Sequence, residues 1–169
     1  MMPKQSKVAI IMGSDTDLEV MREAAGVLNE YGVENKIRIL SAHRSPYMAA
    51  KFAKNARREG FKVIIAGAGG AAHLAGVVAS MTTLPVIGVP METKELKGID
   101  SLFSTVQMPS GVPVATVTIG KAGARNAGIL ALEILSLNDK RIERKLDEHK
   151  KKLAEGVRAK NKSLKGRSG

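Results

Sequence analysis

The sequence of 169 residues contains no cysteine and no tryptophan. The missing cysteine excludes a disulfide scaffold, a thiolate nucleophile and any zinc or iron–sulfur site with cysteine ligands. Aromatic residues make up only 3% of the chain, whereas 44% of its residues are hydrophobic. The chain can therefore bury a core, but aliphatic side chains, alanine and methionine must build it.

Long apolar runs are also missing. No stretch reaches the roughly 18 apolar residues that a membrane-spanning helix needs, so we expect no membrane association. Residues 1–7 lack the apolar segment of a signal peptide, and we therefore expect a cytoplasmic protein. The length is that of one ordinary domain.

Several catalytic and cofactor motifs are absent. His43, His73 and His149 form no close-spaced pair and no His-Glu-x-x-His motif, so no metal site is expected. Gly-x-Ser-x-Gly, the signature of a hydrolase nucleophile, does not occur. The glycines at 67–73 match neither dinucleotide nor P-loop spacing. We expect a protein without cofactors.

The positive charge is unevenly distributed. Residues 139–169 hold 12 Lys/Arg and 5 Asp/Glu, a net of +7, out of +11 for the whole chain. No aromatic residue is interleaved with this basic tail, so a solvated or assembly helix is favoured over a specific nucleic-acid reader. We predict that residues 1–138 form an α/β domain and residues 139–169 a basic helical tail.

Short apolar runs alternate five times with helix-forming segments, which predicts a three-layer, flavodoxin-like doubly wound parallel sheet with a C-terminal helical extension. Thr16 and Glu19 have the spacing of a capping box at the first helix, and Ser45-Pro46 the pattern of another helix start. The expected strands are 7–12, 34–40, 62–66, 84–89 and 112–119, and the expected helices are 16–31, 46–59, 73–81, 96–106, 123–137 and 139–162.

The loop after the first strand, Gly13-Ser14-Asp15-Thr16-Asp17, combines a glycine with hydroxyls at a helix N-terminus. Free N–H groups there favour a phosphate or a sugar, and Asp17 can accept hydrogen bonds from ribose hydroxyls. Plain helix capping explains the same residues equally well.

The loop after the second strand is Ser41-Ala42-His43-Arg44-Ser45-Pro46. Arginine suits bidentate binding of phosphate, and histidine suits proton transfer near neutral pH. A lone histidine is more often structural, but the adjacent Arg44 and the position at a strand end favour a functional role.

After the third strand, Gly67–His73 contains mostly residues with little or no side chain, so a planar ligand can approach the backbone closely. His73 either binds substrate or satisfies backbone groups. A phosphoacceptor signalling module of the same fold would need an aspartate here, where this chain has glycine.

These loops, in this order, resemble those of N5-carboxyaminoimidazole ribonucleotide mutase, the class I catalytic-subunit type of phosphoribosylaminoimidazole carboxylase in purine biosynthesis. The resemblance continues through Pro85–Pro90, Asp100–Gly111 and Ile119–Gly123, and covers about residues 6–137. Arg44 and the unbroken Gly-Ala-Gly-Gly-Ala-Ala-His resemble the mutase form rather than the animal-type direct carboxylase, which typically has Ser-Ala-His-Lys and Ala-Gly-Arg-Ser-Asn.

The resemblance implies an isomerase that moves a carboxylate from N5 to C4 of a phosphoribosyl imidazole by decarboxylation and recarboxylation, without metal or ATP. His43 would be the proton shuttle and the family would imply a homo-octamer. The implied substrate-binding residues are Ser14, Asp17, Ser41, Ala42, Arg44, Gly69, Gly70, His73 and Leu74.

Overall fold

The computed structural model describes residues 7–165 of the chain, and side chains through residue 164. Residues 1–6, most of the segment considered for a signal peptide, and residues 166–169, the end of the basic tail, lie outside the described residues. In the described part, no helix is long and apolar enough to cross a membrane.

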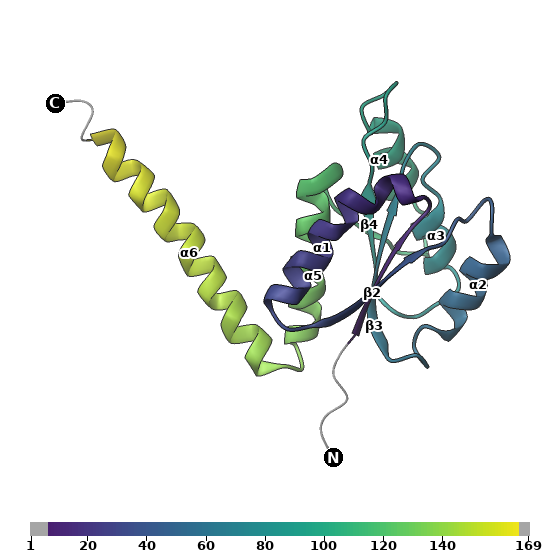
Figure 1. Ribbon diagram of the computed structural model, residues 1–169, viewed down its shortest axis with the longest axis horizontal. Coiled ribbons are helices and arrows are strands. Elements are labelled where there is room, and N and C mark those ends of the chain that lie inside the picture. The colour runs from purple at the N-terminus through teal and green to yellow at the C-terminus, as the bar shows by residue number, and fades with distance from the viewer. Residues whose placement is uncertain (1–6, 166–169) are drawn as a thin grey trace, which may run out of the picture. The chain divides into compact units, whose positions relative to one another are not determined.

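A five-stranded parallel sheet forms the centre of the fold, as predicted (Figure 1). The strand order is β2-β1-β3-β4-β5. β2 therefore lies on one side of β1, and β3, β4 and β5 follow on the other side. In such a sheet the ligand site lies at the carboxyl ends of the strands where the order reverses, here between β1 and β3. The strands are β1 (Lys7–Met12), β2 (Glu34–Ile39), β3 (Phe61–Ala68), β4 (Val86–Pro90) and β5 (Ala115–Thr116).

Helices cover both faces of the sheet (Figure 1). On one face, α5 approaches α1 closely, because a Cβ atom at Gly128 would lie 3.0 Å from the Cβ of Val27. On the other face, α3 and α4 meet over Gly88, where Ala75 and Thr105 are neighbours. The helices are α1 (Leu18–Glu30), α2 (Pro46–Asn55), α3 (Leu74–Ala79), α4 (Ile99–Val106), α5 (Gly120–Ser136) and α6 (Lys140–Lys165), with a 3₁₀ turn, η1 (Asp15–Asp17).

The core follows from the alternation of side chains along the strands. β1 and β3 are buried on both faces, which explains their continuous apolar runs. One face of them packs on α2 and α3, and the edge-to-face pair Phe52–Phe61 sits there with ring centroids 5.8 Å apart. β2 is an edge strand and keeps only partial burial.

The predicted capping box at Thr16 is wrong. Ser14 takes the capping role, because its hydroxyl accepts the Thr16 N–H at 3.3 Å and opens η1, and α1 then begins at Leu18. Glu19 does not return to the backbone but forms an ion pair with Lys121 of α5 at 2.5 Å.

The predicted fifth strand, 112–119, is also too long. Only Ala115–Thr116 pair with β4. Pro113 lacks an N–H for a ladder bond, and past the strand the Thr118 carbonyl packs against the buried backbone of Gly123 in α5.

Several predicted helix ends shift by a few residues. α2 ends at Asn55 rather than 59, and α3 ends at Ala79 rather than 81. α4 starts at Ile99 rather than 96, because the left-handed backbone of Gly98 (φ +90°) does not fit a helix.

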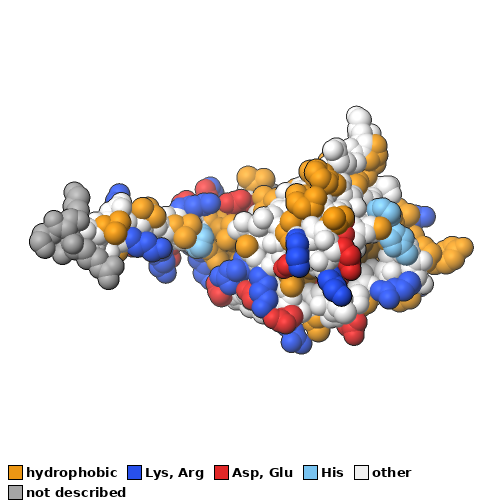
Figure 2. Space-filling view, turned by 90° about the horizontal axis from the view of Figure 1, so that it is seen from above, with side chains coloured by type: hydrophobic (Ala, Val, Ile, Leu, Met, Phe, Trp, Pro, Cys, Tyr) orange, Lys and Arg blue, Asp and Glu red, His pale blue; other side chains and the backbone are white. Residues whose placement is uncertain are grey.

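By compactness the chain falls into two units, which divide at Ala131/Leu132 inside α5. In the second unit, Asp139 caps α6 by accepting the N–H groups of Arg141 (2.9 Å) and Ile142 (3.3 Å). The outer half of α6 is exposed, and cationic side chains line it (Figure 2). A functional division at residues 138/139 stays a prediction.

Candidate functional site

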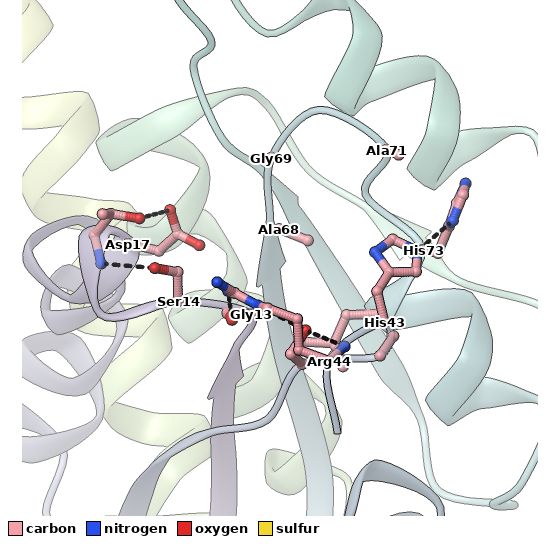
Figure 3. A pocket seen from close by; sticks show the side chains of 13 residues that line it. Gly13, Ser14, Asp17, His43, Arg44, Ala68, Gly69, Ala71 and His73 are labelled. Carbon is pink, nitrogen blue, oxygen red and sulfur yellow. Dashed lines mark hydrogen bonds between the residues drawn. The ribbon is translucent and has the colours of Figure 1, made fainter. Parts of the chain in front are cut away.

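The three loops predicted to meet at the carboxyl edge of the sheet line one cavity of about 440 Å³. Figure 3 shows Ser14 and Asp17 on one side, His43 and His73 on the other, Arg44 between them, and the loop from Ala68 to Ala71 arching over the opening. The lining residues are Gly13, Ser14, Thr16, Asp17, Ser41, Ala42, His43, Arg44, Ala68, Gly69, Ala71, His73 and Leu74.

The loop after β1 presents hydroxyl and carboxylate groups. The Ser14 hydroxyl donates to Asp15 at 3.1 Å, and the Thr16 hydroxyl donates to Asp17 at 3.4 Å. Burial is the main cause that raises the pKa of the half-buried Asp17 carboxyl above its usual 3.8; the Thr16 hydrogen bond lowers it and the Asp15 charge raises it further. The fold holds Asp17 where its charged form is poorly solvated, an arrangement typical of a ligand-binding carboxylate.

The loop after β2 fixes the position of Arg44. Its backbone N–H and its Nε both donate to the Ser41 hydroxyl, at 3.0 and 3.5 Å, and its Nη2 donates to the Gly13 carbonyl at 2.8 Å. Ser45 does not cap α2 through its side chain as its sequence position suggested. Its hydroxyl instead donates to the Ser41 carbonyl at 3.0 Å and accepts the Ser41 N–H at 3.1 Å.

These bonds hold an exposed guanidinium at the mouth of the cavity, with donors left for an anion. A second hollow of about 320 Å³ lies beside Arg44, lined by Gly13–Asp15, Ile39, Ser41 and Ser45. Arg44 therefore stands between two open spaces, and an anionic group can reach it from either.

His43 and His73 are 30 positions apart in the sequence but form one unit. His43 Nε2 lies 2.8 Å from His73 Nδ1, and the rings meet edge to face with centroids 5.0 Å apart. One nitrogen donates the proton of this bond and the other accepts it, and the tautomers of the two rings decide which. Both side chains are exposed at the surface of the single chain.

The glycine loop after β3 lines the cavity through Gly69, Ala71, His73 and Leu74. Gly70, which we predicted as a binding residue, is not among the lining residues of the described chain. Its N–H donates to the Ser101 hydroxyl of α4 at 2.9 Å, and its carbonyl accepts from Ser104 at 3.2 Å. The Gly70 peptide therefore faces α4.

Four residues that line the cavity are absent from the substrate-binding residues that we predicted individually: Gly13, Thr16, Ala68 and Ala71. Their only sequence signal is membership of the three loops. The sequence interpretation also gave no role to Ser101 and Ser104, although both lie in the Asp100–Gly111 motif. The Ser101 hydroxyl bonds to Gly70, 31 residues earlier in the chain, and no local sequence pattern predicts a contact of that kind.

No group of three or more His, Asp or Glu side chains within residues 7–164 is arranged to hold a metal ion. The cavity instead offers a fixed cation, a half-buried carboxyl, hydroxyls and a histidine pair. This set can bind a phosphorylated, hydroxylated ligand at one end and move a proton at the other.

Comparison with known proteins points to one family. The family model of AIR carboxylase matches residues 7–156, so the match continues into α6, beyond the motifs that carried the resemblance. The N5-carboxyaminoimidazole ribonucleotide mutase of Thermotoga maritima is 56% identical over 158 residues, 94% of this chain and 91% of the relative. The protein of the same name from Mycobacterium leprae is 53% identical over 163 residues, 96% and 94% of the two chains.

Among solved structures, Treponema denticola PurE superposes with a TM-score of 0.86 at 29% identity, over 95% of this chain and 99% of that one. The sheet order, the cavity between β1 and β3, and these matches along nearly the whole chain agree. The chain belongs to the AIR carboxylase family.

Proposed function

We propose that this protein is an N5-carboxyaminoimidazole ribonucleotide mutase of purine biosynthesis. The observation that carries the proposal is the His43–His73 pair, at 2.8 Å, beside Arg44 in one cavity. Relatives at 50–57% identity bear the mutase name, which supports the same substrate for this chain.

The phosphoribosyl part of the substrate would bind at the Ser14 side. The Arg44 guanidinium, fixed by Ser41 and Gly13, is suited to pair with the phosphate. Asp17 would accept hydrogen bonds from the ribose hydroxyls. Gly69 and Leu74, with Ala42, would leave room for the flat imidazole, because their small or apolar side chains let it lie against the loop backbone.

Proton transfer would be the task of His43. Its imidazolium gives a proton to N5 as the N5–carboxylate bond breaks, which releases CO₂ and a neutral amine. C4 of the imidazole then attacks the trapped CO₂, and His43 removes the C4 proton to restore the aromatic ring. His43 gives one proton to N5 and takes another from C4, so the proton count balances and the cycle closes without another reactant.

His73 would set the protonation pattern of His43. If His73 Nδ1 accepts the hydrogen bond, Nε2 of His43 keeps its proton, and the other ring nitrogen is the one that exchanges a proton with substrate. In Figure 3 that nitrogen is turned away from His73, toward the Gly69 side of the cavity. The pair thus fixes both the tautomer and the ring orientation.

The chemistry needs little beyond positioning. The substrate already carries its carboxylate, so no ATP is needed to activate it, and we propose a metal- and ATP-independent reaction. A placed acid/base contributes on the order of 10²–10⁴ in rate. Holding CO₂ against C4 contributes through effective concentration.

Direct carboxylation of aminoimidazole ribonucleotide is the second candidate, because the family model is named for an AIR carboxylase. Arg44 and the unbroken 67–73 loop favour the mutase. The two are separated by supplying either the N5-carboxylated ribonucleotide or aminoimidazole ribonucleotide with bicarbonate, without ATP or metal. Fast isomerisation with slow carboxylation supports the mutase, and the reverse pattern makes the protein a carboxylase.

We further propose a cytoplasmic homo-octamer with no specific nucleic-acid partner. Self-association is supported by α4 and the residues before it, where four large apolar side chains at helical spacing are about half exposed: Leu96, Ile99, Phe103 and Val106. We propose that the tail after residue 138 serves assembly rather than chemistry.

A further inference from the structure

The peptide of Gly70 is held from outside the cavity. Gly70 has a left-handed backbone (φ +64°), and its N–H donates to the Ser101 hydroxyl at 2.9 Å. Its carbonyl accepts the Ala72 N–H at 2.8 Å and lies 3.2 Å from the Ser104 hydroxyl. The tight turn that leads to Ala71 and His73 therefore depends on two side chains of α4.

The two serines are not equivalent. Ser101 has no exposed surface, so water does not reach its hydroxyl, although Gly70 itself is partly exposed. The Ser104 hydroxyl has one proton to share between the Gly70 carbonyl and the closer carbonyl of Asp100, at 2.7 Å. Ser101 is therefore the principal contact and Ser104 the secondary one.

The start of α4 is itself tied to the end of β4. The Thr93 hydroxyl donates to Asp100 at 2.7 Å and accepts the Gly98 N–H at 3.1 Å. Gly98 is packed so closely that a Cβ atom there would lie 3.0 Å from the Met91 carbonyl oxygen. Ser101 therefore lies in the first turn of a helix whose start is held by contacts with the segment that follows β4.

The loop has little room to relax toward α4. A Cβ atom at Gly69 would lie 3.3 Å from the Cβ of Met91 and 4.0 Å from the Ser101 hydroxyl. Close packing restrains Gly69, and the hydrogen bond to Ser101 restrains Gly70. Together the two restraints define one position for the turn.

We propose that Ser101, assisted by Ser104, is a positioning residue of the site: it fixes the Gly70 peptide and thereby aligns Ala71 and His73 over the cavity. Neither serine lines the cavity, so they act through the loop. The consequence for catalysis rests on the proposed function. A misplaced loop would loosen the enclosure of CO₂ and shift His73 relative to His43.

The test compares Ser101→Ala with Ser101→Thr, which keeps the hydroxyl. The matched control is Thr105→Val, because Thr105 is an equally buried hydroxyl of α4 that donates only to the Ser101 carbonyl of its own helix, at 2.7 Å. If Ser101→Ala does not fold, Ser104→Ala and Ser104→Thr take its place.

With the N5-carboxylated ribonucleotide we expect Ser101→Ala to lower kcat by roughly 10- to 100-fold, the scale of an ångström-sized misplacement. KM should stay within about threefold, because the phosphoribosyl contacts come from other loops, and more turnovers should end as released aminoimidazole ribonucleotide and CO₂. Ser101→Thr should restore much of kcat. A kcat and a product ratio equal to those of Thr105→Val would overturn the proposal.

Amide hydrogen exchange gives a readout that is independent of turnover. The Gly70 amide should exchange at least about tenfold faster in Ser101→Ala than in Thr105→Val. If the wild-type protein does not isomerise the substrate, the proposed function fails, and exchange alone decides the positioning role. Equal exchange in the two variants would then reject it.

Discussion

His43 is the residue on which the proposed chemistry depends most. His43→Asn removes the proton donor but keeps a polar side chain of similar reach, so we expect kcat to fall by about 10²–10⁴ while substrate still binds. His149→Asn, on α6, is the control and should leave kcat unchanged. Steady-state kinetics and substrate titration measure both effects, and near-normal turnover in His43→Asn would contradict the shuttle role.

His73 should matter in a different way. His73→Phe keeps a ring but cannot accept a proton from His43, so both tautomers of His43 become available. We expect a kcat loss of roughly tenfold or more, together with a change in the shape of the pH–rate profile, because without this hydrogen bond either nitrogen of the His43 ring can carry the proton. An unchanged profile would show that the 2.8 Å contact has no bearing on proton transfer.

The charged form of Asp17 should lower the stability of the fold while it contributes to substrate binding. Burial raises the pKa of its carboxyl above 3.8, so the folded state holds this proton more tightly than the unfolded state does. Stability therefore falls as pH rises from the usual pKa to the raised one, and stays lower above it. Asp17→Asn should lose this decrease, and urea unfolding of both proteins between about pH 3 and pH 7 measures it.

The same substitution should raise KM by about 10- to 100-fold, because it removes a charge-assisted hydrogen bond to substrate. Parallel pH profiles of stability, or an unchanged KM, would remove Asp17 from the proposed role.

At the scale of single residues, the sequence indicated most of the cavity. The positions of Arg44, His43 and Asp17 in the cavity could be predicted because the loops after the strand ends form the ligand site in this fold class. The contact between His43 and His73 could not be predicted, because it depends on how far two loops extend beyond the sheet. Gly70 was predicted as a substrate contact from its place in the glycine loop. The sequence did not indicate that its N–H bonds to Ser101 of α4, and the substrate contact stays a prediction.

At the scale of elements, glycines mark where helices approach the rest of the fold. A Cβ atom at Gly123 would lie 1.6 Å from the Thr118 carbonyl oxygen, so Gly123→Ala forces the backbone apart. We expect it to lower the free energy of unfolding by about 3 kcal/mol or more, at the upper end of overpacking costs.

Gly26→Ala is the matched helical control, since nothing lies within 4 Å of its added Cβ. It should raise stability by roughly 0.5–1 kcal/mol through helix propensity. Chemical unfolding of the two variants tests the packing of α5, and equal effects would contradict it.

Elements with strong periodicity were predicted well, whereas their ends were not. β1 and β3 are buried on both faces and have the continuous apolar runs that such strands require. The start of α1 was misplaced because Ser14 and Thr16 both fit a cap, and only the three-dimensional path of the loop selects Ser14. β5 shrank because Pro113 interrupts an otherwise apolar run.

At the scale of the whole molecule, the fold class followed from the alternation of strands and helices, but assembly did not. Eight chains of 18.0 kDa would form a particle of about 144 kDa. If the apolar face of α4 is buried between subunits, Phe103→Asp, at a side chain 57% exposed in the single chain, should reduce this mass.

Leu137→Asp is the control, because Leu137 is an apolar side chain outside α4 that is 81% exposed. Light scattering of both variants makes the comparison. A wild-type mass near 18 kDa would reject the octamer. If Phe103→Asp kept the full mass of the assembly, the subunit interface would not lie at α4.

The central claim, that this site transfers a carboxylate within one molecule, is tested most directly by isotope retention. The N5-carboxylated ribonucleotide is prepared with ¹³C in its carboxylate and converted in unlabelled bicarbonate without ATP or metal. The mutase reaction predicts that most of the label appears in the C4 carboxylate, because CO₂ is recaptured before it escapes. Unlabelled product would show that the carboxylate comes from solution, and the protein would then be a direct carboxylase.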